Sequence, residues 1–179
     1  MKISKSGFWE TNGTHHFDES LAAALLQLFQ SRGVVSLSDL GCGDGSYTKF
    51  FRDTIPCEGV DGCPLTKKNA GDEFHIADLS ASYELKADWV LSLEVGEHLP
   101  KKYETGFIEN VVNNCERGVV LSWAIPGQGG NGHFNEQSNS YVIDRLCGYG
   151  LKYDEDAAKG LRKASTLSWF KNTIMVFTK

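Results

Sequence analysis

Residues 37–45 read Leu37-Ser-Asp-Leu-Gly-Cys-Gly-Asp-Gly45, a short apolar run that leads directly into three glycines spaced two residues apart. Because these glycines lack a Cβ atom, the backbone can turn sharply and approach a ligand closely. A turn that binds pyrophosphate uses Gly-x-Gly-x-x-Gly spacing and bare N–H groups. Here the third glycine comes one residue early, and the Asp39 carboxylate at the strand end disfavours a phosphate. The stretch therefore predicts a strand, turn and helix that bind a cationic ligand without phosphate.

The composition indicates one globular domain. The chain has 179 residues, of which 41% are hydrophobic and 23% charged, and these values are ordinary for a folded domain of this size. The N-terminus has no apolar leader, and no run of about eighteen apolar residues follows. We therefore predict a single domain over residues 1–179, located in the cytoplasm and without a membrane span.

The cysteines indicate the redox compartment of the protein, and the charge balance indicates which partners it can bind. The five cysteines are scattered and odd in number, which predicts free thiols in a reducing compartment. The net charge is −5, and Lys and Arg are dispersed along the chain. This balance makes nucleic acid an unlikely partner.

Strand-like and helical segments alternate, which predicts parallel βαβ units. Asp18 is expected to cap a helix that ends near Gly33, so residues 1–33 form an N-terminal lid or helix region and residues 34–179 the core. We expect strands over residues 34–40, 57–61, 74–78, 87–94 and 118–125, a sixth that opens at residue 151 and a last one over residues 172–178.

The run Asp39-Leu-Gly-Cys-Gly-Asp-Gly45 closely resembles the first motif of the class I S-adenosylmethionine (SAM)-dependent methyltransferases. The resemblance implies an α/β fold, a three-layer Rossmann-like sandwich whose mostly parallel seven-stranded sheet has an antiparallel last strand. It also implies SAM as the cofactor that donates the methyl group.

Acidic residues end three consecutive expected strands, at Asp39, Asp61 and Asp78. Asp61 follows Gly41 by twenty positions, the distance at which an acid reaches the ribose hydroxyls of a bound nucleotide. Each acid can also simply cap the following helix. The family resemblance implies that Asp61 and the neighbouring Gly62 bind the ribose of the cofactor.

The resemblance also implies the remaining cofactor contacts. Asp78 would accept a hydrogen bond from the adenine amino group, and Leu79 would cover the ring. The sulfonium and amino-acid end would lie over Gly41 and Gly43, near Glu94. Cys42 lies in the same turn and is expected to pack beneath it, since no basic residue beside it in sequence would stabilise a thiolate.

The stretch Glu94-Val-Gly-Glu97-His98 follows the fourth expected strand, and on a helical turn Glu94, Glu97 and His98 would share one face. With His133, the pattern resembles the metal-binding set of the small-RNA 3′-end 2′-O-methyltransferases, and it also resembles the ubiquinone-pathway O-methyltransferases. Such ligands suit Mg²⁺, Mn²⁺ or Zn²⁺. The same pattern is widespread in class I enzymes that need no metal, so the sequence alone does not favour one.

An acceptor hydroxyl or amine must lose a proton during methyl transfer, and a histidine suits that step. His133 is the first candidate because it lies in the glycine-rich stretch after the fifth expected strand. Glu136, His98 and Tyr47 are further candidates. The aromatic residues of the first seventeen positions are expected to form a lid or a plain packing segment.

The pattern as a whole favours methyl transfer from SAM to a small-molecule acceptor, with a hydroxyl preferred over an amine. A metal-assisted RNA 2′-O-methyltransferase and a catalytically silent, cofactor-binding regulatory subunit stay open as alternatives. Dinucleotide oxidoreduction is disfavoured by the displaced third glycine.

Overall fold

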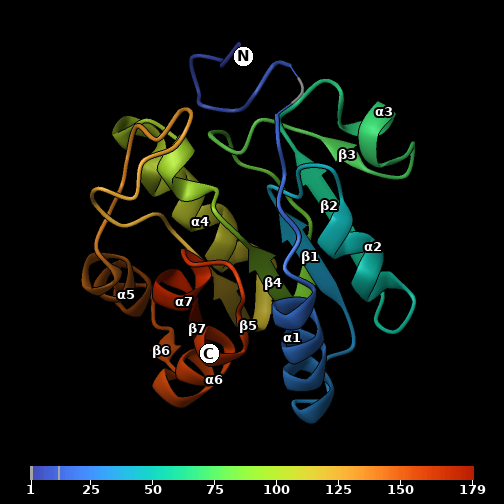
Figure 1. The fold of residues 1–179 in the computed structure, drawn as a ribbon, viewed down its shortest axis with the longest axis vertical. Coiled ribbons are helices and arrows are strands. Elements are labelled where there is room, and N and C mark those ends of the chain that lie inside the picture. The colour runs from blue at the N-terminus through green and yellow to red at the C-terminus, as the bar shows by residue number, and fades with distance from the viewer. Residues whose placement is uncertain (1, 12) are drawn as a thin grey trace.

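The computed structural model describes residues 2–11 and 13–179 and folds them into a three-layer α/β sandwich (Figure 1). Within those residues, a seven-stranded sheet has the order β3-β2-β1-β4-β5-β7-β6. The strands are β1 (Leu37–Leu40), β2 (Cys57–Asp61), β3 (His75–Ile76), β4 (Ala87–Ser92), β5 (Cys115–Leu121), β6 (Lys152–Tyr153) and β7 (Met175–Thr178). β7 runs antiparallel to β5 and β6, while the pairs among β1 to β5 are parallel. The expected fold class is confirmed.

Helices cover both faces of the sheet. One core packs α1 (Glu19–Ser31), α2 (Ser46–Arg52), α6 (Glu155–Ala164) and α7 (Phe170–Thr173) against one face. A second core packs α4 (Glu104–Asn114) and α5 (Asn139–Gly148) against the other. The short α3 (Thr66–Ala70) precedes β3, and the 3₁₀ turns η1 (Gly96–His98) and η2 (Lys101–Tyr103) connect β4 to α4. Both faces of β4 are therefore buried, as its apolar sequence predicts.

Some element boundaries differ from the sequence-based expectation. β7 begins at Met175 rather than at residue 172, because residues 170–173 form α7, in which the Thr173 hydroxyl donates to the Trp169 carbonyl at 3.0 Å. β5 begins at Cys115, before the apolar run. Its Arg117 is held by an ion pair with Asp88 of the neighbouring strand β4.

Asp18 connects the start of α1 to the distant C-terminal segment. Its Oδ1 atom caps α1 by accepting a hydrogen bond from the Leu21 N–H at 3.1 Å. Its Oδ2 atom accepts from the Thr166 and Leu167 N–H groups at 2.7 and 2.9 Å. Since the side chain is buried, these three N–H groups have no ready access to replacement water.

We expect Asp18→Ala to lower the free energy of unfolding by about 2–4 kcal/mol, because a helix cap and two further buried hydrogen bonds are lost. Burial acts to raise the pKa of Asp18, but the hydrogen bonds from Leu167, Leu21 and Thr166 outweigh it and the pKa is lowered. The stabilisation is therefore present above about pH 4, the ordinary value, and is lost as the pH falls through the folded-state pKa. Urea unfolding of both proteins at pH 7 and pH 3 measures this, and an undiminished difference at pH 3 would contradict it.

Two further findings concern the whole chain. All five cysteines are free, as expected from their number and spacing. In the part of the chain that the structure describes, no helix is both long enough and apolar enough to span a bilayer.

Candidate functional site

A cavity of about 830 Å³ lies at the carboxyl ends of the central strands. It is placed where the strand order reverses between β1 and β4, the position at which open α/β sheets bind ligands. Its volume is in the range typical of small-molecule sites. Its walls come from the N-terminal segment (residues 6–9, 11 and 13–16), the turn after β1 and the loops after β2, β3 and β4. The glycine-rich loop (residues 125–131 and 133) and residues 168–170 and 172 complete them.

Two positions in the glycine turn after β1 can be occupied only by glycine, because the backbone there lies very close to other side chains. Gly41 and Gly43 have φ values of 86° and 57°, a region that side chains disfavour. A Cβ atom at Gly41 would come within 2.3 Å of Val95, and one at Gly43 within 2.5 Å of the His15 ring. Between them, Cys42 is buried, and burial raises the pKa of its thiol. The structure thus places Cys42 as a neutral packing residue in the turn.

Two of the three strand-end acids surround this turn. Asp39 is buried and accepts a hydrogen bond from the Thr48 hydroxyl at 2.6 Å, and burial raises the pKa of Asp39 to about 7. Asp61 accepts from the Gly43 N–H at 2.9 Å and from the Cys63 N–H at 2.7 Å. Each Asp61 oxygen keeps a lone pair for a ligand hydroxyl.

The third acid, Asp78, lies at the far end of the same cavity, beside Leu79. Its Oδ1 atom accepts from the Ser80 N–H at 2.9 Å, and its Oδ2 atom accepts from the Ser6 hydroxyl at 2.6 Å. The N-terminal segment therefore reaches the edge of the sheet. Phe8 belongs to the same segment, and its ring packs against Gly62, where a Cβ atom would come within 2.5 Å.

Trp9 connects the N-terminal segment to the other end of the cavity. Its ring lies 5.4 Å from the His15 ring and 5.5 Å from the His98 ring, measured between centroids. Its Nε1 atom is buried and has no hydrogen-bond partner among the described residues. The Trp9 and His98 side chains both line the cavity.

Glu94 is placed differently from the expectation. It has a positive φ of 54°, so the chain turns away before the 3₁₀ turn η1, and Glu94 does not share a helical face with Glu97 and His98. Its carboxylate accepts from the Gln128 side-chain amide at 2.5 Å and from the Thr173 hydroxyl at 3.3 Å. Burial raises its pKa. The carboxylate thus joins the glycine-rich loop to α7 at the cavity wall.

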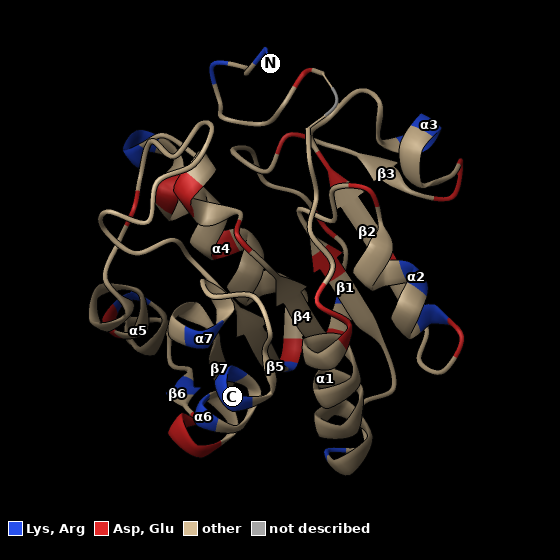
Figure 2. Cartoon of the chain, viewed as in Figure 1, with Lys and Arg blue, Asp and Glu red and all other residues tan. Residues whose placement is uncertain are grey.

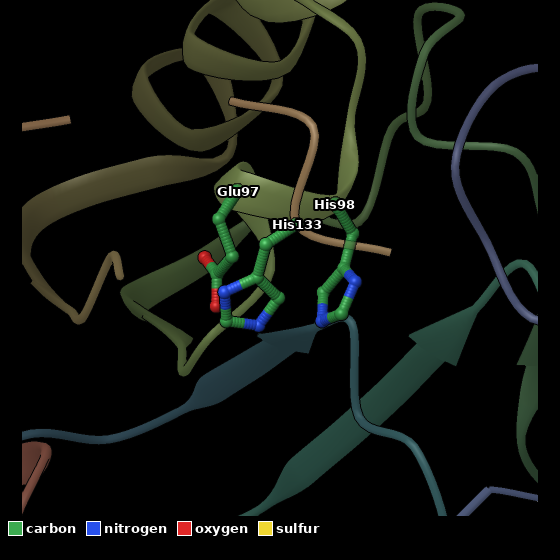
Figure 3. A group of neighbouring side chains, drawn as sticks. All are labelled: Glu97, His98 and His133. Atoms are coloured by element: carbon green, nitrogen blue, oxygen red, sulfur yellow. The ribbon is translucent and has the colours of Figure 1, made fainter. Parts of the chain in front are cut away.

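Glu97, His98 and His133 form a compact group (Figure 3), in which one potential ligand atom of each lies within 4.8 Å of the others. Glu97 is 0% exposed, and neither carboxylate oxygen has a hydrogen-bond partner in the described ranges. Burial and the neighbouring Glu94 carboxylate raise the pKa of Glu97. Nearby backbone N–H groups lower this pKa, but by less than the increase. His98 and His133 line the cavity.

Both histidine rings are held through their Nδ1 atoms. His98 Nδ1 lies 3.2 Å from the Gly132 carbonyl oxygen, so it carries the proton and donates. His133 Nδ1 lies 3.2 Å from Glu136 Oε1. The two rings are perpendicular, with centroids 5.0 Å apart. Burial, reinforced by His133, lowers the pKa of His98 to about 4, so His98 is neutral at physiological pH.

Glu136 was expected among the catalytic residues, but its carboxylate is directed to the loop itself. It accepts from the Gly127 and Gly129 N–H groups, both at 2.7 Å, as well as from His133. These backbone hydrogen bonds lower its pKa. Because Glu136 is not among the described residues that line the cavity, it orients His133 and the loop instead of facing a ligand.

Several contacts around the site could not be predicted from the sequence pattern. Ser6 and Gln128 are ordinary polar residues, and their contacts with Asp78 and Glu94 join segments far apart in the chain. Trp169 and Phe170 also line the cavity. Their segment is helical only over Phe170–Thr173, which fits the weak periodicity of that part of the sequence.

No family model matches the chain. Tocopherol O-methyltransferase, chloroplastic, of Arabidopsis thaliana is 24% identical over 166 residues, which cover 82% of this chain and 47% of that protein. The chain thus spans about half the length of this curated relative. Magnesium protoporphyrin IX methyltransferase from Synechocystis PCC 6803, solved with bound SAH, has a TM-score of 0.68 at 16% identity, over 94% of this chain and 90% of that one.

A second solved structure has the same architecture. The amino pentose methyltransferase CalS10 from Micromonospora echinaspora, solved with SAM, has a TM-score of 0.67 at 14% identity, over 94% of this chain and 99% of that one. Together with the strand order, these likenesses identify the fold as the Rossmann-like fold of class I SAM-dependent methyltransferases. The matched relative and both structures are methyltransferases.

Proposed function

We propose that the chain is a SAM-dependent methyltransferase that methylates a hydroxyl group of a small molecule. One observation carries this proposal: a single cavity joins the glycine turn and the three strand-end acids to His98 and His133, which lie against the buried Glu97. A methyl donor bound over the glycine turn then lies beside histidines that can promote loss of the acceptor proton. The methyltransferase fold supports the same activity.

The cofactor-binding roles follow from the placement of the acids. Asp61 accepts hydrogen bonds from the two ribose hydroxyls, beside Gly62. Asp78 accepts a hydrogen bond from the adenine amino group, and Leu79 covers the adenine ring. Both carboxylates line the cavity, and each is already oriented by a backbone N–H group. Such prior orientation lowers the entropy cost of binding.

The methionine end of SAM lies over the glycine turn. Gly41 and Gly43 allow close approach, and the buried Asp39 favours a positively charged neighbour. Glu94 positions the opposite wall through Gln128. The sulfonium is already activated for in-line displacement, so the protein contributes position, exclusion of water and removal of the acceptor proton.

A small acceptor is supported by the relatives of the chain and by its charge. The relatives named above act on tocopherol, a porphyrin and an amino pentose. Lys and Arg lie on separate helices and loops rather than in one continuous basic stripe (Figure 2). An RNA acceptor is therefore disfavoured.

Calorimetry tests the central claim. SAM and its demethylated product, S-adenosylhomocysteine (SAH), are each titrated into the protein. The release of SAH from SAM is then measured with a panel of phenols, catechols and sugars as acceptors. We expect both cofactor forms to bind and at least one hydroxyl compound to be methylated. Absence of binding by either form would overturn the proposal, and binding without transfer to any acceptor would support the silent-subunit alternative.

We also propose that the N-terminal segment acts as a lid over the cofactor. Ser6, Phe8 and His15 contact the loops that carry Asp78, Gly62 and Gly43. A lid in this position excludes water from the methyl transfer. The segment includes Met1 and Asn12, which lie outside the described residues.

Removal of residues 1–17 is expected to weaken SAM affinity by at least about tenfold, because several contacts at the mouth of the cavity are lost. Calorimetry measures the affinity, and circular dichroism checks that the fold is retained. Lys2→Ala is a matched control, since the Lys2 side chain is exposed and forms an ion pair with Glu10 of the same segment. Equal SAM affinity and turnover in the truncated protein would exclude the lid.

A further inference from the structure

Asn135 is a buried residue, 3% exposed, whose backbone and side-chain polar groups are all hydrogen-bonded. Its N–H donates to the Glu97 carbonyl at 2.9 Å, and its carbonyl accepts from Trp123 Nε1 at 2.7 Å. Its Oδ1 atom accepts from Gln137 Nε2 at 2.6 Å, and its Nδ2 atom donates to Glu104 Oε2 at 2.9 Å. Asn135 is not among the described residues that line the cavity. Its contacts therefore hold the chain and not a ligand.

The loop before Asn135 needs such an anchor. Four of the six residues that precede His133 are glycine, and glycine loses more conformational freedom on folding than any other residue. Gly127, Gly129 and Gly132 have positive φ values of 89°, 69° and 83°. A segment of this composition has little conformational preference of its own. Contacts that fix its ends therefore determine where His133 lies.

Asn135 also fixes the two cavity histidines relative to each other. The Glu97 carbonyl accepts from the Phe134 and Asn135 N–H groups, both at 2.9 Å. These hydrogen bonds join the residue before His98 to the chain directly after His133. The two imidazole rings are perpendicular, with centroids 5.0 Å apart (Figure 3). A displacement of Asn135 would therefore move one ring against the other.

Glu104 anchors the Asn135 side chain from the start of α4, where it is 2% exposed. Its carboxylate also accepts from Lys101 Nζ at 2.8 Å and from the Tyr141 hydroxyl at 2.5 Å, and Arg145 Nε lies 3.7 Å from it. Burial acts to raise the pKa of Glu104, but these hydrogen bonds and the one from Asn135 outweigh it and the pKa is lowered. The acceptor for Asn135 Nδ2 is thus a charged group, which strengthens the hydrogen bond.

We propose that Asn135 is a positioning residue that sets the orientation of His133 and His98 toward the methyl acceptor. Glu104 holds its side chain in place. The inference rests on the proposed function, in which these histidines promote loss of the acceptor proton. Proton transfer requires contact at hydrogen-bond length, so a displacement of about 1 Å can lower the rate by about 100-fold. SAM binding is assigned to the strand-end acids, so its affinity should not respond to Asn135.

An exchange of donor and acceptor tests the contact between Asn135 and Glu104. Asn135→Asp keeps the side-chain shape but places a second carboxylate against Glu104, so the hydrogen bond is lost. We expect turnover to fall by about 10- to 100-fold while SAM affinity stays within about threefold. The double variant Asn135→Asp/Glu104→Gln sets an amide donor opposite a carboxylate and should restore turnover to within about fivefold of wild type. Initial rates of SAH release measure turnover, and calorimetry measures SAM affinity.

A second measurement needs neither SAM nor acceptor. In protein with ¹⁵N-labelled histidine, nuclear magnetic resonance reports which imidazole nitrogen carries the proton. His98 should show the form protonated at Nδ1, since this atom donates to the Gly132 carbonyl. Asn135→Asp should shift the His98 and His133 signals, and the double variant should return them. The signal of His75, which is not among the described residues that line the cavity, should stay unchanged and serves as the internal reference.

Asn114→Ala is the matched control for a general loss of stability. Asn114 is also buried and forms three side-chain hydrogen bonds, but it is not among the described residues that line the cavity. Its replacement should lower stability while turnover stays within about threefold. An equal loss of turnover in Asn114→Ala would overturn the positioning role. Wild-type turnover together with unshifted His98 and His133 signals in Asn135→Asp would overturn it as well.

Hydrogen exchange of the wild-type protein tests the anchor even where a variant does not fold. The Phe134 and Asn135 N–H groups should exchange at least about 100-fold more slowly than in an unstructured chain, and exchange at the unstructured rate would overturn the proposal. A protein that transfers methyl groups but is unaffected by Asn135→Asp contradicts only the positioning role. A protein that shows the expected histidine shifts but does not bind SAM contradicts only the methyltransferase proposal.

Discussion

Asp61→Ala is expected to weaken SAM binding by about 100- to 1,000-fold. The carboxylate is proposed to accept hydrogen bonds from two ribose hydroxyls. Hydrogen bonds to a charged group contribute about 1.5–3 kcal/mol each, and two bonds near the lower end of that range account for a loss of about 3–4 kcal/mol. Asp61 also accepts from the Gly43 and Cys63 N–H groups at 2.9 and 2.7 Å, so the glycine turn becomes less ordered as well. Calorimetric titration with SAM measures the change.

Two further variants at β2 make this result specific. Asp61→Asn keeps one acceptor oxygen and should give an intermediate affinity, because the charge and the second acceptor oxygen are lost. Glu58→Gln changes an exposed acid on the same strand, whose partner is His75, and should not alter SAM binding. Wild-type affinity in Asp61→Ala would show that the ribose assignment is wrong, while an equal loss in Glu58→Gln would indicate a general effect on β2.

His133→Ala is expected to lower turnover by about 10²- to 10⁴-fold while SAM affinity changes by less than about threefold. This separation follows because His133 lies with Glu97 and His98 at the acceptor end, and removal of a proton-transfer group typically costs this much. Initial rates of SAH release are measured at saturating SAM with the acceptor that the panel identifies. A parallel SAM titration measures affinity.

The controls for this prediction use the residues around the loop. Glu136→Gln should lower turnover less than His133→Ala and should shift the pH dependence of the rate, because the carboxylate orients the His133 ring. His75→Ala should retain the wild-type rate. If His133→Ala retains most of the activity, or loses SAM binding and turnover together, the acceptor-side assignment is wrong.

The sequence predicted the fold well because its signals are local. Asp18 caps α1 as expected, and the strand after it leads into the glycine turn. Apolar β4 occupies the sheet centre with both faces buried. Gly41 and Gly43 adopt the left-handed conformations that their residue type permits. Each of these outcomes depends on neighbouring residues or on a simple burial pattern, so no distant contact had to be known.

The acceptor side was harder to predict because its contacts are not local. A helical turn was expected to align Glu94 with Glu97, but a positive φ at Glu94 redirects its carboxylate to Gln128 and Thr173. Glu136 was expected to act on substrate, yet it holds the backbone of its own loop. Both differences arise from hydrogen bonds between segments whose relative position the sequence does not specify.

The sequence by itself therefore determined the class of fold and predicted a turn suited to a phosphate-free ligand, since the glycine spacing and Asp39 lie within one short segment. Only the tertiary structure decided that Glu97 is buried beside His98 and His133, with no hydrogen-bond partner for its carboxylate among residues 2–11 and 13–179. Burial and charge compensation depend on every element packed around a group. For this chain, those elements include a loop more than thirty positions further along the sequence.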